Sequence, residues 1–143
     1  MSTASTFADL GAAAAVGMAP AYHAEVAPDR MAIIAVTGDR TFRELNANAN
    51  RLARALRRRG VGVGDSVCLV CANRAEFAEA MAAVNRIGVR VTPVNWHLTG
   101  AEMAYIVENS DAKVVLGDAR FAPALQVAAD RACLLYTSDA ADE

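Results

Sequence analysis

The chain has 143 residues, of which 55% are hydrophobic and 21% are charged, a composition typical of one globular domain. Its formal net charge of −2 gives no electrostatic case for binding nucleic acid or an anionic membrane. No apolar run approaches the roughly 18 residues that a membrane span requires, so we expect none.

Residues 1–26 are expected to form an N-terminal leader or helix that precedes the patterned part of the chain. The run from Gly11 to Val16 is rich in alanine and raises the question of a secretory signal peptide. Such a peptide needs a basic start, yet no Lys or Arg precedes Arg30. We therefore expect a cytoplasmic protein. His23 falls in this segment and is expected at the surface.

The first patterned elements are a strand at Met31–Val36, a turn over residues 37–40 and a helix over residues 41–59. Thr41 and Glu44 have the spacing of a capping box, and Gly60 provides the left-handed residue that ends a helix. The inward face of the helix has apolar residues three and four apart, namely Phe42, Leu45, Ala49, Leu52 and Leu56.

Five arginines crowd the last turns of this helix: Arg51, Arg54, Arg57, Arg58 and Arg59. Cations suit the carboxyl end of a helix, where they interact favourably with its dipole. They could instead form a nucleic-acid patch. The net charge favours a solvated helix face.

Short apolar runs and helical segments alternate after Gly60. The runs Val67–Cys71, Val89–Val94 and Lys113–Leu116 lack polar alternation, which predicts strands buried on both faces of a parallel sheet. Helices are expected to open at Asn73 with Glu76, closed by Gly88, and at Thr99 with Glu102. The expected fold class is α/β, with three layers and a largely parallel sheet joined by right-handed βαβ crossovers.

Two motifs favour structure over chemistry. Cys68 and Cys71 form a CxxC pair that could be a redox or zinc half-site, but the pair lies inside an apolar run and has no second pair, which favours buried structural cysteines. The glycines Gly60, Gly62 and Gly64 follow a helix and lead into a strand. A dinucleotide-binding loop needs the opposite order, so a turn is the better interpretation.

The helix and strand pattern stops at Cys133. Residues 133–143 resemble the translation of a transposon-end adapter used in preparing DNA libraries for sequencing. We therefore expect this segment not to be native and exclude it from the fold.

Two loops are candidate ligand sites, because ligands of open parallel sheets bind beyond the carboxyl ends of the strands. The first is residues 72–74, Ala-Asn-Arg. The second is residues 95–98, which place an amide, an indole and an imidazole just before the helix start at Thr99. In the alternative interpretation, Asn95 and Thr99 cap a turn and Trp96 packs over it.

Several segments together resemble the opening of adenylate-forming enzymes. They are Thr-Phe-Arg-Glu-Leu at 41–45, Gly-Asp-Ser-Val at 64–67, Asn-Arg-Ile-Gly-Val at 85–89, Pro-Val-Asn at 93–95 and Leu-Thr at 98–99 with Glu102 and Tyr105-Ile106. Each motif is weak alone. In this order they resemble the superfamily of acyl-CoA synthetases, luciferases and peptide-synthetase adenylation domains. The Asn-Trp-His-Leu-Thr variant is most similar to fatty-acyl and related carboxylate–CoA ligases.

The resemblance implies that residues 27–132 are part of the N-terminal domain of an AMP-forming acyl-CoA synthetase. Such enzymes use ATP and Mg²⁺ to convert a small-molecule carboxylate to an acyl adenylate, then transfer the acyl group to coenzyme A. The chain lacks the family's phosphate loop ending in Pro-Lys-Gly, its Thr-Glu metal pair, its ribose-binding Asp and its C-terminal lysine. The resemblance therefore implies no catalytic residue and no metal ligand here. None of these cofactors is expected to bind well to this chain alone.

One binding residue carries over. Some ligases of the family have an arginine in Asn-x-Arg-Leu that helps bind a phosphate of coenzyme A, and His97 occupies that position. A histidine can still donate a hydrogen bond to a phosphate. Two other functions remain open: a non-catalytic α/β binding module, and an adenylation domain that loads a carrier protein.

Overall fold

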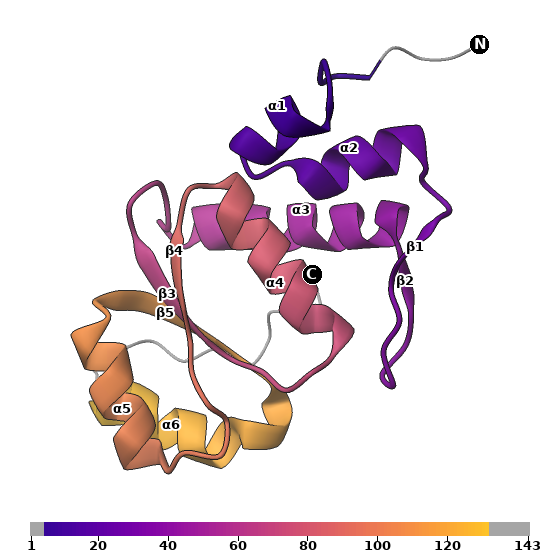
Figure 1. Cartoon of the computed structure of the whole chain (residues 1–143). Helices are drawn as coiled ribbons and strands as arrows, with labels where there is room; N and C mark the ends of the chain where they lie inside the picture. Colours follow the sequence, from indigo (N-terminus) through magenta and orange to yellow (C-terminus); the bar gives the residue numbers. More distant parts are fainter. Residues whose placement is uncertain (1–4, 132–143) are drawn as a thin grey trace. The chain divides into compact units, whose positions relative to one another are not determined.

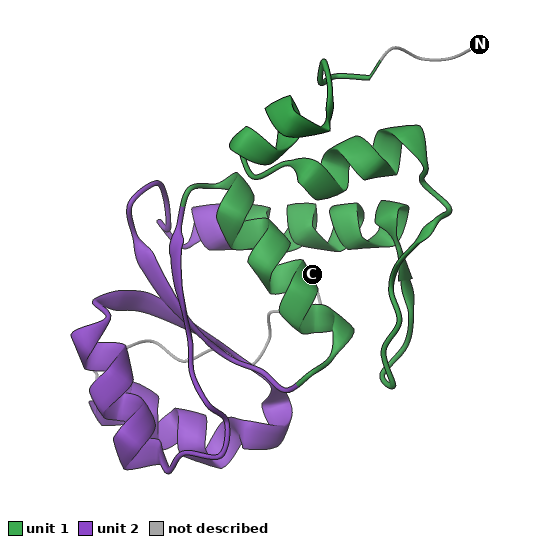
Figure 2. Cartoon of the chain, in the orientation of Figure 1, with its two compact units in different colours: residues 1–54, 73–88 green, residues 55–72, 89–143 purple. Residues whose placement is uncertain are grey.

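The computed structural model describes residues 5–131, which fall into two compact units (Figure 2). The first unit takes in the chain up to Arg54 and the segment Asn73–Gly88, and the second takes in Ala55–Ala72 and the chain from Val89 onward. No helix in the described part of the chain is long and apolar enough to cross a membrane. Residues 133–143, which we expect not to be native, lie outside the described residues.

The first unit is mainly helical and contains one short hairpin (Figure 1). Its elements are α1 (Leu10–Ala15), α2 (Ala19–Val26), β1 (Met31–Ile33), β2 (Arg40–Thr41), most of α3 (Phe42–Arg58) and α4 (Ala75–Arg86).

The N-terminal segment, expected to be a leader or helix, forms the two helices α1 and α2. Asp9 caps α1 by accepting a hydrogen bond of 2.8 Å from the backbone N–H of Ala12. His23 is half-buried, and its ring stacks on Phe42 at a centroid distance of 4.6 Å. The histidine expected at the surface is therefore partly covered, because the aromatic residue that opens α3 provides a partner.

The first strand is shorter than expected. β1 ends at Ile33 rather than Val36 and pairs antiparallel with β2, which the sequence did not predict. Ile34 and Val36 are 84% and 106% exposed. Apolar character alone therefore did not extend the strand beyond the residues that β2 can pair with.

The ends of α3 follow their local sequence signals. The Thr41 N–H donates to Glu44 Oε2 at 2.8 Å, while the Glu44 N–H approaches Thr41 Oγ1 at 3.3 Å, as in a capping box. Gly60 has a φ of 76°, and the N–H of Val61 donates to the carbonyl of Leu56 at 3.0 Å. These bonds satisfy backbone groups that a helix end leaves unpaired.

The start of α4 differs from the prediction. Arg74, not Asn73, is the N-cap, and it provides no side-chain capping bond. Its guanidinium instead forms two bonds to the Glu76 carboxylate, at 2.9 Å and 3.1 Å. Glu76 therefore pairs with Arg74. It does not complete a capping box with Asn73.

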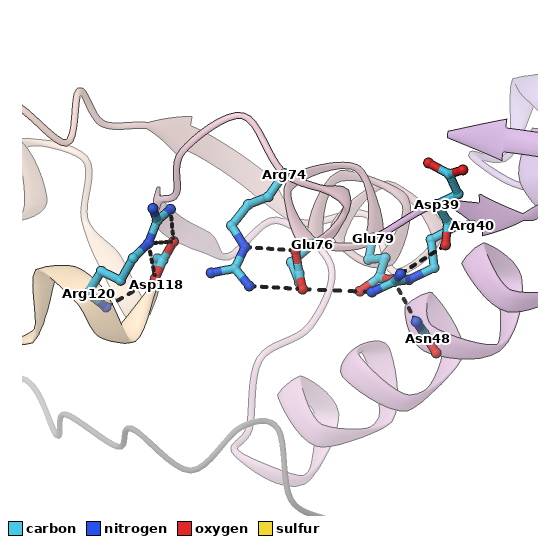
Figure 3. Close-up of polar contacts among 8 residues, drawn as sticks. All are labelled: Asp39, Arg40, Asn48, Arg74, Glu76, Glu79, Asp118 and Arg120. Atoms are coloured by element: carbon cyan, nitrogen blue, oxygen red, sulfur yellow. Dashed lines mark hydrogen bonds and ion pairs between the residues drawn. The ribbon is translucent and has the colours of Figure 1, made fainter. Parts of the chain in front are cut away.

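A nearly buried ion pair links the hairpin to α4 in the same unit (Figure 3). Arg40 Nε donates to Glu79 Oε1 at 2.8 Å, and the side-chain amide of Asn48 donates to the same oxygen. Glu79 is only 9% exposed, so removing either donor would leave a poorly solvated carboxylate.

The second unit is built on a parallel sheet, which confirms the α/β class. Its elements are β3 (Ser66–Val70), β4 (Arg90–Pro93), α5 (Gly100–Asn109), β5 (Ala112–Gly117), the 3₁₀ turn η1 (Ala119–Phe121) and α6 (Ala122–Arg131). The strand order is β4-β3-β5, and β3 pairs parallel with both neighbours. The hand of the crossovers stays a prediction.

Only the central strand is buried along its whole length, so the prediction of full burial was wrong for β4 and β5. Each of those two strands has one paired neighbour among the described residues. A hydrophobic core in this unit contains Met103, Val107, Leu125 and Ala128, each at most 2% exposed. α6 therefore contributes to the core, although the sequence reading did not predict this helix.

The capping box of α5 forms as predicted and gives the protein a pH-dependent contact. The backbone N–H of Thr99 is the largest cause that lowers the pKa of Glu102 from its usual 4.5, and the Thr99 hydroxyl adds to it. Since the folded-state pKa lies below the unfolded value, the contact stabilises the fold above about pH 4.5 and is lost as the pH falls through the folded-state pKa.

We therefore expect Glu102→Gln to lower the free energy of unfolding at neutral pH and to reduce its fall on acidification. Urea unfolding at a series of pH values measures both effects. Glu108→Gln is the matched control, because Glu108 is exposed on the same helix but outside the cap. If the free energy of unfolding of both variants falls with pH as it does for the original chain, Glu102 is not an acid-sensitive cap.

Candidate functional site

The carboxyl ends of the three parallel strands meet at one edge of the second unit. β3 ends at Val70, β4 at Pro93 and β5 at Gly117. The Val94 N–H donates to the carbonyl of Leu69 at 2.9 Å, and the Asp118 N–H donates to the carbonyl of Val70 at 2.9 Å. The loops after β4 and β5 are thus attached to the end of β3, at the position where open parallel sheets bind ligands.

The loop after β4 is a turn that displays two rings. Asn95 Oδ1 accepts a hydrogen bond of 3.0 Å from the backbone N–H of His97, which is the geometry of an Asx turn. The rings of Trp96 and His97 lie 3.5 Å apart between centroids, tilted by 30°, and both residues are exposed. The capping interpretation of Asn95 is confirmed, and it leaves the histidine ring accessible.

The loop after β5 contains a buried carboxylate that the sequence reading missed. The Asp118 side chain is 2% exposed and caps η1 by accepting a 3.0 Å bond from the Arg120 N–H. The Arg120 guanidinium also binds this carboxylate, with its terminal nitrogen 2.7 Å from Oδ2 (Figure 3). The available signal was an acidic residue directly after an apolar run with an arginine two positions later.

Aromatic stacking joins the two loops. The Phe121 ring lies 5.2 Å from the Trp96 ring at an interplanar angle of 15°, and the Arg120 guanidinium carbon lies 5.5 Å from the Phe121 centroid. We name His97, Trp96, Phe121 and Arg120 the edge stack. It offers a planar apolar surface, an imidazole and a guanidinium, which suit an anionic or aromatic group rather than bond-breaking chemistry.

The two cysteines of the CxxC pair have different surroundings. Cys68 is buried, its sulfur lies 3.2 Å from the Ser110 hydroxyl, and burial raises the pKa of its thiol. Cys71 lies beyond the end of β3 and is half-buried, so the prediction of a buried pair holds only for Cys68. Across residues 5–131, no group of three His, Cys, Asp or Glu side chains could hold a metal ion.

Two further segments were considered as ligand loops, residues 72–74 and the glycine-rich segment 60–64. Residues 72–74 are divided between the two units, and the Arg74 side chain bonds to Glu76 in the first. The glycine-rich segment leads from α3 into β3 as the turn interpretation predicted. It is closed by Asp65, whose carboxylate accepts the Gly62 N–H at 2.8 Å.

Comparison with known proteins identifies the family of this chain. Residues 21–143 match the family described as AMP-binding enzyme. The chain is 36% identical over 98 residues to the medium/long-chain-fatty-acid–CoA/3-oxocholest-4-en-26-oate–CoA ligase of Mycobacterium marinum, covering 68% of this chain and 18% of that protein. It is 38% identical over 98 residues to the 2-succinylbenzoate–CoA ligase of Bacillus licheniformis, covering 68% of this chain and 20% of that one.

The fold agrees with solved structures. The structure titled as a Mycobacterium tuberculosis fatty acyl CoA synthetase superposes with a TM-score of 0.72 at 30% identity, covering 78% of this chain and 22% of that chain. The present chain therefore spans about a fifth of the length of the curated relatives that it matches. From the extent of the family match and the agreement in fold, we conclude that the chain belongs to the AMP-binding enzyme family.

Proposed function

We propose that this chain is the N-terminal part of a cytoplasmic carboxylate–CoA ligase. That enzyme would join a small-molecule carboxylate to coenzyme A through an acyl adenylate, using ATP and Mg²⁺. The observation that carries the proposal is the family match over residues 21–143, together with curated relatives whose names describe CoA ligases. Residues 27–132 are proposed as part of the N-terminal domain and residues 1–26 as a leader that includes the first helices.

The chain's own contribution would be binding and scaffolding. The phosphate loop and the Thr-Glu pair expected for the family do not occur in the 143 residues, so ATP and Mg²⁺ would depend on the rest of the enzyme. ATP supplies the activation of the carboxylate when it is bound there. The parallel sheet would hold the loops after β4 and β5 in place beside that chemistry.

His97 is the residue of this chain that we propose to contact coenzyme A. Its ring is exposed at the carboxyl edge, its backbone is fixed by Asn95, and it forms part of the edge stack. A ring nitrogen could donate a hydrogen bond to a phosphate, and the neighbouring Trp96 limits where the ring can point. These features fit a phosphate group, although an exposed contact of this kind contributes only on the order of 1 kcal/mol.

In the full-length ligase, we expect His97→Ala to raise the KM for coenzyme A several-fold and to leave ATP–pyrophosphate exchange unchanged. His97→Arg should preserve or improve coenzyme A binding, because a guanidinium is a stronger phosphate ligand. Steady-state thioesterification and pyrophosphate exchange, measured on the same preparations, test this. Equal damage to both reactions would mean that His97 only shapes the turn.

A second candidate is an adenylation domain that loads a carrier protein. The observation in its favour is 27% identity over 105 residues to the fatty acid–[acyl-carrier-protein] ligase ScoC of Streptomyces coeruleorubidus. Offering the full-length enzyme both coenzyme A and a phosphopantetheinylated carrier protein separates the two. Acyl transfer to the carrier alone would replace the coenzyme A proposal. A third candidate, a non-catalytic α/β module, predicts transfer to neither.

A further inference from the structure

The amino end of the parallel sheet in the second unit carries a compact cationic segment. Residues 57–64 read Arg-Arg-Arg-Gly-Val-Gly-Val-Gly and contain no acidic residue. They form the end of α3 and the turn into β3, which Figure 2 draws within the second unit. Arg57, Arg58 and Arg59 are all exposed, and none has an ion pair in the described part of the chain. We name residues 57–64 the basic turn.

An apolar side chain projects from the same turn. Val63 is 88% exposed, whereas Val61, two residues earlier, is 2% exposed. The sequence therefore places one valine in the core and leaves the next in solvent between Gly62 and Gly64. An exposed aliphatic side chain next to a cluster of cations is a combination that favours the interface of an anionic lipid bilayer.

The turn is held in one conformation. The Asp65 carboxylate accepts the Gly62 N–H at 2.8 Å, the Asp65 N–H donates to the Gly62 carbonyl at 3.1 Å, and Gly64 has a φ of 84°. Lys113 from β5 forms a 2.8 Å ion pair with the same carboxylate. Val63 is thus presented by a preorganised loop, which reduces the entropy lost on docking.

The charges around the basic turn keep it positive. Arg90 and Lys113 lie at the starts of β4 and β5, at the same end of the sheet. Asp65 and Asp111 directly precede β3 and β5 at that end, and Asp65 is already paired with Lys113. The overall charge of −2 averages over acids elsewhere in the chain, so it does not describe this surface.

The helix dipole gives a simpler reason for cations in the last turn of α3. It accounts for Arg57 and Arg58, which belong to that turn. It also accounts for Arg59, whose guanidinium donates to the carbonyl of Ala55 in the same turn at 3.4 Å. It does not account for an exposed valine next to these arginines. The two explanations make different predictions for Val63.

We propose that the basic turn docks on the surface of a bilayer that contains anionic phospholipids. The guanidinium groups of Arg57, Arg58 and Arg59 contact the phosphate headgroups, and Val63 enters the interfacial region. This proposal does not depend on the ligase assignment, because it uses no substrate or cofactor site.

The test is co-sedimentation of the 143-residue chain with vesicles of phosphatidylcholine alone and of phosphatidylcholine mixed with phosphatidylserine. We expect binding to the mixed vesicles only, and binding that weakens as salt is raised. The double substitution Arg57→Glu/Arg58→Glu should weaken it by at least about tenfold. Val63→Ser should weaken it by about fivefold, because part of the affinity is apolar burial.

The matched control is Arg30→Glu/Arg43→Glu, which makes the same change in net charge on exposed arginines of the first unit. It should leave binding within about twofold of the original chain if the basic turn is the docking surface. Circular dichroism of each variant checks that the fold is retained.

Three results would overturn the proposal. The first is no binding to mixed vesicles, and the second is an equal loss in the two double variants. The third is vesicle binding that Val63→Ser leaves unchanged, together with binding of duplex DNA as tight as that of the mixed vesicles. That result would indicate a general affinity for polyanions.

Discussion

The 143-residue chain is expected to show no ATP–pyrophosphate exchange with any carboxylate in a broad panel. In adenylate formation, the transition state is stabilised mainly by cations and hydrogen-bond donors placed around the phosphates. The family's phosphate loop, metal ligands and lysine that provide them are absent from this sequence. The edge stack offers only His97 and Arg120, and the carboxylate of Asp118 already binds that guanidinium.

The assay measures labelled ATP formed from pyrophosphate, with a buffer blank and a full-length fatty acyl CoA synthetase as a positive control on a fatty acid. Exchange by the chain above the blank would contradict the expectation. It would mean that residues 1–143 contain a nucleotide site that the sequence comparison did not identify.

The largest expected effect on stability is at Gly17. This glycine has a φ of 72°, and a Cβ built on it would lie 2.6 Å from the backbone carbonyl oxygen of Asn85 in the same unit. Gly17→Ala therefore forces a left-handed alanine against an atom that cannot rotate away. We expect it to lower the free energy of unfolding by about 3 kcal/mol, measured by urea denaturation.

Gly60→Ala is the matched control for this effect. Gly60 has nearly the same φ, 76°, but a Cβ there would meet nothing within 4 Å. Gly60→Ala should lower the free energy of unfolding only by the strain of a left-handed alanine, about 1 kcal/mol. If both substitutions cost the same, the close packing of Gly17 against α4 is not present in solution.

Elements whose signals lie within a few residues were predictable. The Thr41 and Thr99 capping boxes and the helix end at Gly60 each depend on groups three to five residues apart, and all three formed. The prediction at Asn73 failed although its spacing was the same. There the Arg74 guanidinium engages Glu76, a competition between side chains that a spacing rule does not include.

Features that depend on distant partners could not be predicted. β4 and β5 read as fully buried strands, yet their exposure is set by what lies beside each strand rather than by its own residues. The aromatic stacking in the edge stack depends on Trp96 and Phe121 meeting across two loops that are separate in sequence. α6 was missed because its buried face is mostly alanine, and its packing rests on Leu125 lying close to Gly117.

His97 shows how far the sequence predicts a functional role. Its place after a strand and before a helix predicted a position at the carboxyl edge of the sheet, and the structure has it there, with the ring exposed. Its ligand is inferred from family resemblance, and its role as a phosphate contact stays a prediction.

The central claim is that this chain is the opening of a longer carboxylate–CoA ligase. Sequencing the source locus beyond codon 132 tests it most directly. We predict an open reading frame that replaces residues 133–143 and reaches, within a few tens of codons, a Ser/Thr/Gly-rich loop ending in Pro-Lys-Gly. A stop codon at that point, or a frame that continues without such a loop, would contradict the claim and favour a non-catalytic module.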